Sequence, residues 1–338
     1  MLGDIAKMGH LLEKPKLETV YLGGGTPSVL SLELLEAISC AIHSEFDASG
    51  LAEATIEANP GTLNPAWLNA ARRCGWDRIS LGIQSLDDGQ LVRLGRMHDS
   101  AQGLEAVAMC KNAGFARISA DLLLGTPGQD SGRALNDARR LVESGAKHLS
   151  IYMLDLDKEC PLKLQVENGV LELPDEGLVA DAYLALMESL PNLGLTHYEI
   201  SNFSFPGHES AHNCRYWIRL PYLGLGPSAA SNIGSIRWTE CENPAEWIEG
   251  YTEQEVCHLS PKESLAEVPM LGLRMSQGIN WGKLRGKAGA VGISALVDAW
   301  ENDLEPFLVR GLLRRNGENL SLTAKGVLLS NQVLMVFA

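Results

Sequence analysis

The sequence predicts an α/β fold, an open and partial (β/α)6 barrel of the TIM type followed by a smaller helical domain. Short apolar runs alternate with helical patterns from residue 19 to residue 200, which is typical of parallel strands joined by helices. The runs are apolar without alternation, as in strands that are buried on both faces. A complete eight-fold barrel needs roughly 250 residues, so a repeat of this length favours an open barrel.

Six stretches are expected to form the strands, and helices are expected between most of them. Ser31 is a suitable N-cap for the helix after the first strand, and Gly75 ends a helix at residues 67–74. Strands that alternate with helices are parallel and joined by right-handed crossovers. The carboxyl ends of parallel strands should meet at one edge of the sheet. The expected strands are residues 19–22, 54–58, 78–84, 117–124, 148–152 and 196–200.

Three glycines follow the first predicted strand and carry the first hypothesis about function. Residues 23–25 lack a Cβ, so their backbone can turn tightly and contact a ligand. Thr26 precedes Pro27, which holds it extended and delays the next helix. Ligands bind at this edge of parallel sheets and barrels. An ordinary strand-to-helix turn explains the glycines equally well, since the P-loop lysine and the GxGxxG spacing are both missing.

Four polar residues follow or interrupt the strands at the same edge: Glu57, Gln84, Arg96 and Asp121. Each alone is explained as a capping or supporting group, but the active sites of such barrels are assembled at this edge. A carboxylate in an apolar run, such as Asp121, is costly to bury unless it is paired or faces a cavity. Together these groups would suit an amino acid joined to a nucleoside. Backbone carbonyls would bind its ammonium group, Arg96 its carboxylate, and acidic residues its ribose hydroxyls.

A second cluster of polar and aromatic residues lies at residues 208–217. His208 and His212 have the i, i+4 spacing of metal-binding pairs on a helix, but the HExxH arrangement of zinc hydrolases is absent. A histidine beside aromatic residues can also ligate haem iron, with Tyr216 and Trp217 covering the flat macrocycle. The alternative is a hydrogen-bonded histidine at the boundary between two domains.

Composition and charge limit the possible partners. The 338 residues carry a net charge of −14 with a pI of about 5.0, so the chain is not expected to bind nucleic acid. No apolar stretch is long enough for an integral membrane segment, and residues 1–8 do not resemble a secretory signal. The cysteines are odd in number and scattered, which predicts reduced thiols and a cytoplasmic location. They are Cys40, Cys74, Cys110, Cys160, Cys214, Cys241 and Cys257.

The pattern changes near residue 240, and we divide the chain into domains at residues 1–235 and 236–338. Helices with a short hairpin in the second domain resemble a winged helix. The domain is not strongly basic, so nucleic-acid binding is disfavoured. The expected elements are helices at residues 263–275, 295–304 and from 328 to the end, and a hairpin around Asn316-Gly317.

A series of segments occurs in an order and spacing that closely resemble the HemN/HemW branch of the radical S-adenosylmethionine proteins. This branch contains the oxygen-independent coproporphyrinogen III oxidases and their haem-chaperone relatives. The resemblance covers roughly residues 17–235, and the tail resembles the family's C-terminal domain. The segments are YLGGGTPS, IEANPG, RISLGIQS, LGRMH, DLLLGTPGQ, YEISNF and HNCRYW.

The resemblance implies two cofactor sites. The segment from His212 to Trp217 is similar to the haem chaperone's signature, which implies that His212 takes part in haem binding. Gly24, Gly25 and Thr26 would lie against the methionine end of S-adenosylmethionine. The rest of that pocket would be lined by Glu57, Gln84, Arg96 and Asp121.

The chain also departs from the family. Family members carry a CxxxCxxC loop on a first strand upstream of the glycines, and its three thiolates hold a [4Fe–4S] cluster. None of this chain's cysteines can replace that loop, so we expect a barrel without its first strand. As written, the chain should lack radical chemistry and should not be catalytic. Either the start is mis-assigned and the loop lies upstream, or the chain is a paralogue that lost the cluster.

Three functions follow from these observations. The favoured one is a haem chaperone that binds haem and S-adenosylmethionine, with haem or porphyrin and haem-acceptor proteins as partners. The alternative is a coproporphyrinogen III oxidase, which converts two propionate side chains into vinyl groups. The acidic charge counts mildly against its tetracarboxylate substrate. The third is a degenerate, cluster-less paralogue. The oligomeric state is left open.

Overall fold

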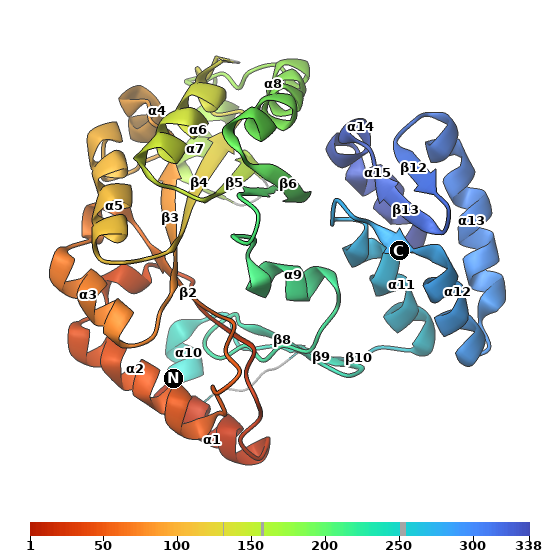
Figure 1. Cartoon of the computed structure of the whole chain (residues 1–338), viewed down its shortest axis with the longest axis horizontal. Coiled ribbons are helices and arrows are strands. Elements are labelled where there is room, and N and C mark those ends of the chain that lie inside the picture. The colour runs from red at the N-terminus through yellow and green to blue at the C-terminus, as the bar shows by residue number, and fades with distance from the viewer. Residues whose placement is uncertain (131, 157–158, 251–254) are drawn as a thin grey trace. The chain divides into compact units, whose positions relative to one another are not determined.

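The computed structural model describes residues 1–130, 132–156, 159–250 and 255–338 (Figure 1). Its contacts divide the chain into two compact units. The sheet unit contains Lys16–His43 and Ala48–Ser210, and the helical unit contains Met1–Pro15, Ser44–Asp47 and Ala211–Ala338. The domain boundary that we placed after residue 235 stays a prediction.

The sheet unit is built on seven strands in the order β1-β2-β3-β4-β5-β7-β6, of which Figure 1 labels β2 to β6. The first five pair in parallel, whereas β7 is antiparallel to both β5 and β6. The predicted α/β class and the open, partial barrel are confirmed. The strands are β1 (Thr19–Leu22), β2 (Glu53–Ala58), β3 (Arg78–Gln84), β4 (Arg117–Leu124), β5 (His148–Met153), β6 (Thr196–Glu199) and β7 (Asn202–Ser204).

The far edge of the sheet differs from the prediction, because β7 lies between the fifth and sixth predicted strands. Only residues 200–201 separate β6 from β7, which is too short for the crossover that parallel pairing needs. The chain therefore folds back as a hairpin. A strand of three residues carries too little hydrophobic pattern to be recognised in the sequence.

Helices cover the parallel strands, and local sequence signals fix where they begin. The Asn64 side chain accepts a hydrogen bond from the Trp67 backbone N–H, with Pro65 in the first turn of α3. Asp99 and Gln102 form a capping box at the start of α5. The helices are α2 (Leu32–Glu45), α3 (Pro65–Arg73), α4 (Asp88–Arg93), α5 (Ser100–Asn112), α6 (Arg133–Ser144), α7 (Pro161–Glu167) and α8 (Glu176–Ser189), with short 3-10 turns at Pro27–Val29, Pro60–Thr62 and Leu190–Leu193.

The helical unit contains two small antiparallel sheets. The first sheet has the order β10-β9-β8 and contains β8 (Ala230–Ile233), β9 (Ile236–Thr239) and β10 (Glu255–His258). The second sheet has the order β11-β13-β12 and contains β11 (Ile279–Asn280), β12 (Leu313–Asn316) and β13 (Asn319–Leu322). The predicted hairpin is confirmed, because Asn316 pairs with Asn319 across a turn in which Gly317 has a φ of 58°.

The helices that follow residue 260 pack around the second of these sheets and form an apolar core that includes Trp281, Val297 and Trp300. The prediction missed α12, because three glycines in its ten residues hide the helical period. No helix in the described ranges is long and apolar enough to cross a membrane. The helices are α1 (Leu2–Leu11), α9 (Ala211–Trp217), α10 (Pro244–Ile248), α11 (Pro261–Gly272), α12 (Trp281–Ala290), α13 (Ser294–Val309), α14 (Ala324–Leu328) and α15 (Ser330–Leu334), with a 3-10 turn at Met335–Phe337.

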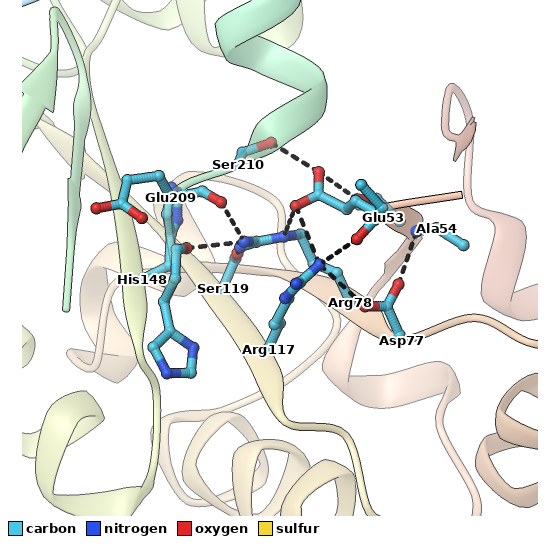
Figure 2. Close-up of polar contacts among 12 residues, drawn as sticks. Glu53, Ala54, Asp77, Arg78, Arg117, Ser119, His148, Glu209 and Ser210 are labelled. Atoms are coloured by element: carbon cyan, nitrogen blue, oxygen red, sulfur yellow. Dashed lines mark hydrogen bonds and ion pairs between the residues drawn. The ribbon is translucent and has the colours of Figure 1, made fainter. Parts of the chain in front are cut away.

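A buried arginine connects the amino ends of the parallel strands (Figure 2). Arg78 begins β3 with its side chain 1% exposed, and its Nε lies 2.8 Å from Glu53 Oε2 at the start of β2. Its Nη1 donates to Ser119 Oγ on β4 at 3.0 Å. Its Nη2 donates to the backbone carbonyls of His208 and Glu209, each at 2.7 Å. One guanidinium therefore holds three strand starts and the segment that leads out of the sheet unit.

We expect Arg78→Met to destabilise the chain by roughly 3–5 kcal/mol, because it leaves the Glu53 carboxylate buried without its main cation. Arg73→Met is the matched control. Arg73 Nη2 lies 3.8 Å from Glu36 Oε1, and the two side chains are 66% and 53% exposed. That exposed pair should contribute at most about 1 kcal/mol. Urea unfolding monitored by circular dichroism measures both values. Equal losses in the two variants would contradict this role of Arg78.

Candidate functional site

The carboxyl edge of β1 and β2 holds Glu57 in a fixed position. The Tyr21 hydroxyl donates to Glu57 Oε1 at 2.6 Å, and the Gly24 backbone N–H donates to Oε2 at 3.0 Å. A Cβ on Gly23 would lie 2.5 Å from a Tyr21 ring carbon and 2.8 Å from the Glu57 carboxyl carbon. Gly24 and Gly25 have φ values of 81° and 60°, and a Cβ on either would meet open space. Glycine is therefore needed both for close packing and for the left-handed turn.

A second set of contacts joins the ends of β2 and β3. Asn59 Nδ2 donates to Thr26 Oγ1 at 3.1 Å, and its Oδ1 accepts from Arg96 Nη2 at 3.0 Å. The same Arg96 nitrogen donates to the Gly82 carbonyl at 2.7 Å. A Cβ on Gly82 would lie 2.8 Å from Arg96 Nη2 and 3.2 Å from Gln84 Nε2, so both side chains pass over this glycine. Arg96 is thus held by the protein on one of its terminal nitrogens.

Asp121 on β4 completes the group. Ser80 Oγ donates to Asp121 Oδ1 at 3.4 Å. Burial, together with the nearby Glu57 charge, raises the pKa of the Asp121 carboxyl to about 6, although hydrogen bonds from Ser150 and Ser80 and the Arg96 charge oppose the rise. At neutral pH the carboxyl is therefore mostly ionised, in a place where a second carboxylate lies close by.

Two tyrosines share this electrostatic environment. Burial raises the pKa of Tyr21, and the charges of Glu57 and Asp121 add to the rise. Burial followed by the Asp121 charge likewise raises the pKa of Tyr152, at the carboxyl end of β5. Both phenols therefore stay protonated and can donate hydrogen bonds. A concentration of negative charge beside neutral donors favours a cationic group at this edge.

The structure brings six of the predicted residues into one neighbourhood of the sheet unit. Gly25 lies between two of them, Gly24 and Thr26. Sequence reasoning missed Tyr21, Asn59 and Tyr152. The rule that selects polar residues at strand ends applies equally to Tyr152, whereas Asn59 appears only within the IEANPG segment of the resemblance. The six residues are Gly24, Thr26, Glu57, Gln84, Arg96 and Asp121.

His212 belongs to the helical unit and has its own surroundings on α9. Its Nε2 lies 2.9 Å from the Tyr216 hydroxyl, and the two rings are perpendicular with centroids 5.0 Å apart. Tyr216 in turn packs edge-on against Tyr222, with centroids 4.7 Å apart. The imidazole is therefore oriented by a hydrogen-bonded aromatic group.

The i, i+4 spacing of His208 and His212 does not place both on one helix, because α9 begins at Ala211. Arg78 binds the backbone carbonyls of His208 and Glu209, which precede this helix. Within the described ranges, no group of three or more His, Cys, Asp or Glu residues could hold a metal ion.

The chain's thiols do not fit an iron–sulfur cluster. All seven cysteines are free, and the two nearest in sequence are Cys241 and Cys257, far from a CxxxCxxC spacing. The polar group at the sheet edge does fit S-adenosylmethionine by its chemistry. Glu57 and Asp121 suit the cationic groups, Arg96 suits the carboxylate, and the bare backbone at Gly24 and Gly25 leaves room for a ligand.

Known proteins match the chain along most of its length. The family model for the radical SAM superfamily matches residues 2–141, and that for the HemN C-terminal domain matches residues 259–329. "Heme chaperone HemW" of Lactococcus lactis is 33% identical over 96% of this chain and 86% of its own length. The Bacillus subtilis protein of the same name is 30% identical over 100% of this chain and 88% of its own length.

A solved structure shows the same architecture. The coproporphyrinogen III oxidase HemN from Escherichia coli, described as a radical SAM enzyme, superimposes with a TM-score of 0.84 at 19% identity. The superposition covers 99% of this chain and 81% of that one. At this identity the likeness establishes the fold, namely a curled half-barrel sheet followed by a HemN-type C-terminal domain.

We expect Asp121→Asn to stabilise the chain at pH 7.5 by roughly 1–3 kcal/mol, since the ionised carboxyl is disfavoured in the folded state. The folded pKa of about 6 lies above the ordinary value of 3.8, so the folded chain binds the extra proton between these values. The advantage of the variant should therefore shrink as the pH falls from 6 towards 4. Urea unfolding over this range tests it, with the exposed Glu105→Gln as control. An advantage independent of pH would contradict the assignment.

Proposed function

This chain belongs to the HemN/HemW family of radical S-adenosylmethionine proteins, and from that premise we propose that it is a haem chaperone. It binds haem at α9 of the helical unit and S-adenosylmethionine at the carboxyl edge of the sheet unit, and it delivers haem to an acceptor protein. The observation that carries the proposal is the orientation of His212 by Tyr216 within the HNCRYW segment.

The surroundings of His212 suit haem for two reasons. A histidine that ligates iron through one ring nitrogen is generally held through the other, which fixes the ring and raises its basicity. The Tyr216 hydroxyl supplies such a contact at 2.9 Å. Tyr216 and Tyr222 add aromatic surface beside the histidine, and a porphyrin is a flat apolar macrocycle.

The sheet edge would bind S-adenosylmethionine through charge complementarity. The cofactor carries an ammonium and a sulfonium group, which the Glu57 and Asp121 carboxylates attract, and a carboxylate, which Arg96 attracts. In radical SAM proteins the bound cofactor supplies a radical when an iron–sulfur cluster reduces it. The ligands of that cluster are not among this chain's cysteines, so the residues described act only in binding and orienting the cofactor.

The haem-chaperone proposal predicts a haem spectrum that depends on His212. Titration of haem into the full chain should shift the Soret band and saturate at one equivalent. His212→Ala should abolish or move the band, whereas His258→Ala, an exposed histidine on β10, should leave it unchanged. Absence of a Soret shift in the unmodified chain would overturn the proposal, and identical spectra for all three chains would overturn the role of His212.

The S-adenosylmethionine proposal predicts binding that depends on the Asp121 charge. Isothermal titration calorimetry should show weaker binding at pH 5.5 than at pH 7.5, because protonation near pH 6 removes one of the two carboxylates. Asp121→Asn should weaken binding roughly tenfold at pH 7.5 and remove most of the pH dependence. Glu105→Gln should behave as the unmodified chain does. If Asp121→Asn binds S-adenosylmethionine as tightly as the unmodified chain at pH 7.5, the Asp121 carboxylate does not face the ligand.

A further inference from the structure

Two arginines in the helical unit share one carboxylate beside α9. Arg219 Nε lies 2.6 Å from Glu267 Oε2, and Arg237 Nη2 lies 2.6 Å from Glu267 Oε1. Glu267 is on α11 and its side chain is 12% exposed, whereas Arg237 is on β9. A third arginine, Arg274, lies with its guanidinium 5.4 Å from the centre of the Trp217 ring. The last residue of α9 is therefore next to a positively charged group.

This group has more positive charge and more donors than Glu267 satisfies. Arg219 Nη2 and Arg237 Nε are buried, and neither has a hydrogen-bond partner among the described residues. Buried donors are normally paired, and a guanidinium offers five of them in a planar fork. Two arginines with one shared carboxylate leave a net positive charge in a chain whose overall charge is −14. Such a site favours a further carboxylate as its ligand.

Arg219 also occupies a backbone position that normally belongs to glycine. Its N–H donates to the Tyr216 carbonyl at 3.0 Å, and the Leu220 N–H donates to the Arg215 carbonyl at 3.0 Å. These bonds form the Schellman motif that ends α9, with Arg219 as the left-handed residue at a φ of 57°. A side chain at this position strains the backbone. The cap does not need the arginine, so its guanidinium is the feature to be explained.

We propose that Arg219 and Arg237 bind the propionate carboxylates of the porphyrin. This inference rests on the proposed haem-binding function and adds the part of the site that recognises the edge of the macrocycle. His212 is in the first turn of α9 and Arg219 is in the cap that follows the helix, about two helical turns further along, which separates an iron ligand from a carboxylate site. A fork-shaped guanidinium binds a carboxylate through two parallel hydrogen bonds, so it recognises free propionates and rejects esters.

A pair of porphyrins tests the proposal. Haem and haem dimethyl ester have the same iron and macrocycle, but the ester lacks both charges. In one water–dimethyl sulfoxide buffer, the unmodified chain should bind haem roughly tenfold to a hundredfold more tightly than the ester, as expected for one or two charged hydrogen bonds. The Soret band should be the same for both, because the iron ligand is unchanged.

Arg219→Gly is the decisive variant, because glycine is the usual residue of this cap and Arg237 still neutralises Glu267. Its circular dichroism and thermal midpoint should match those of the unmodified chain, while haem affinity falls to nearly that of the ester. Arg237→Gln should weaken haem binding in the same direction. Arg310→Gln, an exposed arginine on the surface of the same unit, is the matched control and should change nothing.

The outcomes separate this inference from the proposed function. Equal affinity for haem and its ester, or full haem affinity in folded Arg219→Gly, would overturn the propionate site while a Soret shift upholds haem binding. No Soret shift with either porphyrin would overturn haem binding and the propionate site together. Ester discrimination that persists in both arginine variants would place carboxylate recognition elsewhere in the chain and would also overturn the proposal.

Discussion

The buried guanidinium of Arg78 is the interaction on which the rest of the structure depends. A charge in this position needs a counter-ion and a full set of acceptors, and it obtains them from Glu53, from Ser119 and from two backbone carbonyls (Figure 2). Because these partners begin neighbouring strands, they hold the strands at their amino ends. Strand pairing then carries the alignment along the sheet, so that Ser80 on β3 meets Asp121 on β4. The charged group at the opposite edge therefore inherits its geometry from this contact.

The same arginine holds the end of the sheet unit, just before α9. It binds the carbonyls of His208 and Glu209, and the helix begins at Ala211. His208 and His212 consequently lie in different structural surroundings despite their i, i+4 spacing. A seven-residue helix is too short to be stable alone, so α9 depends on contacts at its two ends. Arg78 holds the segment before it, and the Schellman cap at Arg219 closes it.

The sequence allowed the parallel strands and most of the sheet-edge residues to be predicted, because burial on both faces leaves a continuous apolar run and a polar tip. Elements fixed by tertiary contacts escaped prediction. Strand β7 is three residues long and exists through its pairing with β5 and β6. Tyr21 carried no signal, since its contact with Glu57 joins residues far apart in the sequence. The spacing of His208 and His212 likewise could not show that only His212 lies on a helix.

Local charge, rather than the net charge of −14, decides which ligands the two units can accept. The sheet edge gathers the Glu57 and Asp121 carboxylates, and their mutual repulsion is relieved by a cationic ligand. The end of α9 has the opposite imbalance, with Arg219 and Arg237 sharing Glu267. One pair of arginines would match two propionates at a single edge of a porphyrin, whereas four carboxylates spread around a ring would need further cations. The distribution of charge thus supports the proposed haem-binding function more than the alternative of an enzyme that acts on coproporphyrinogen.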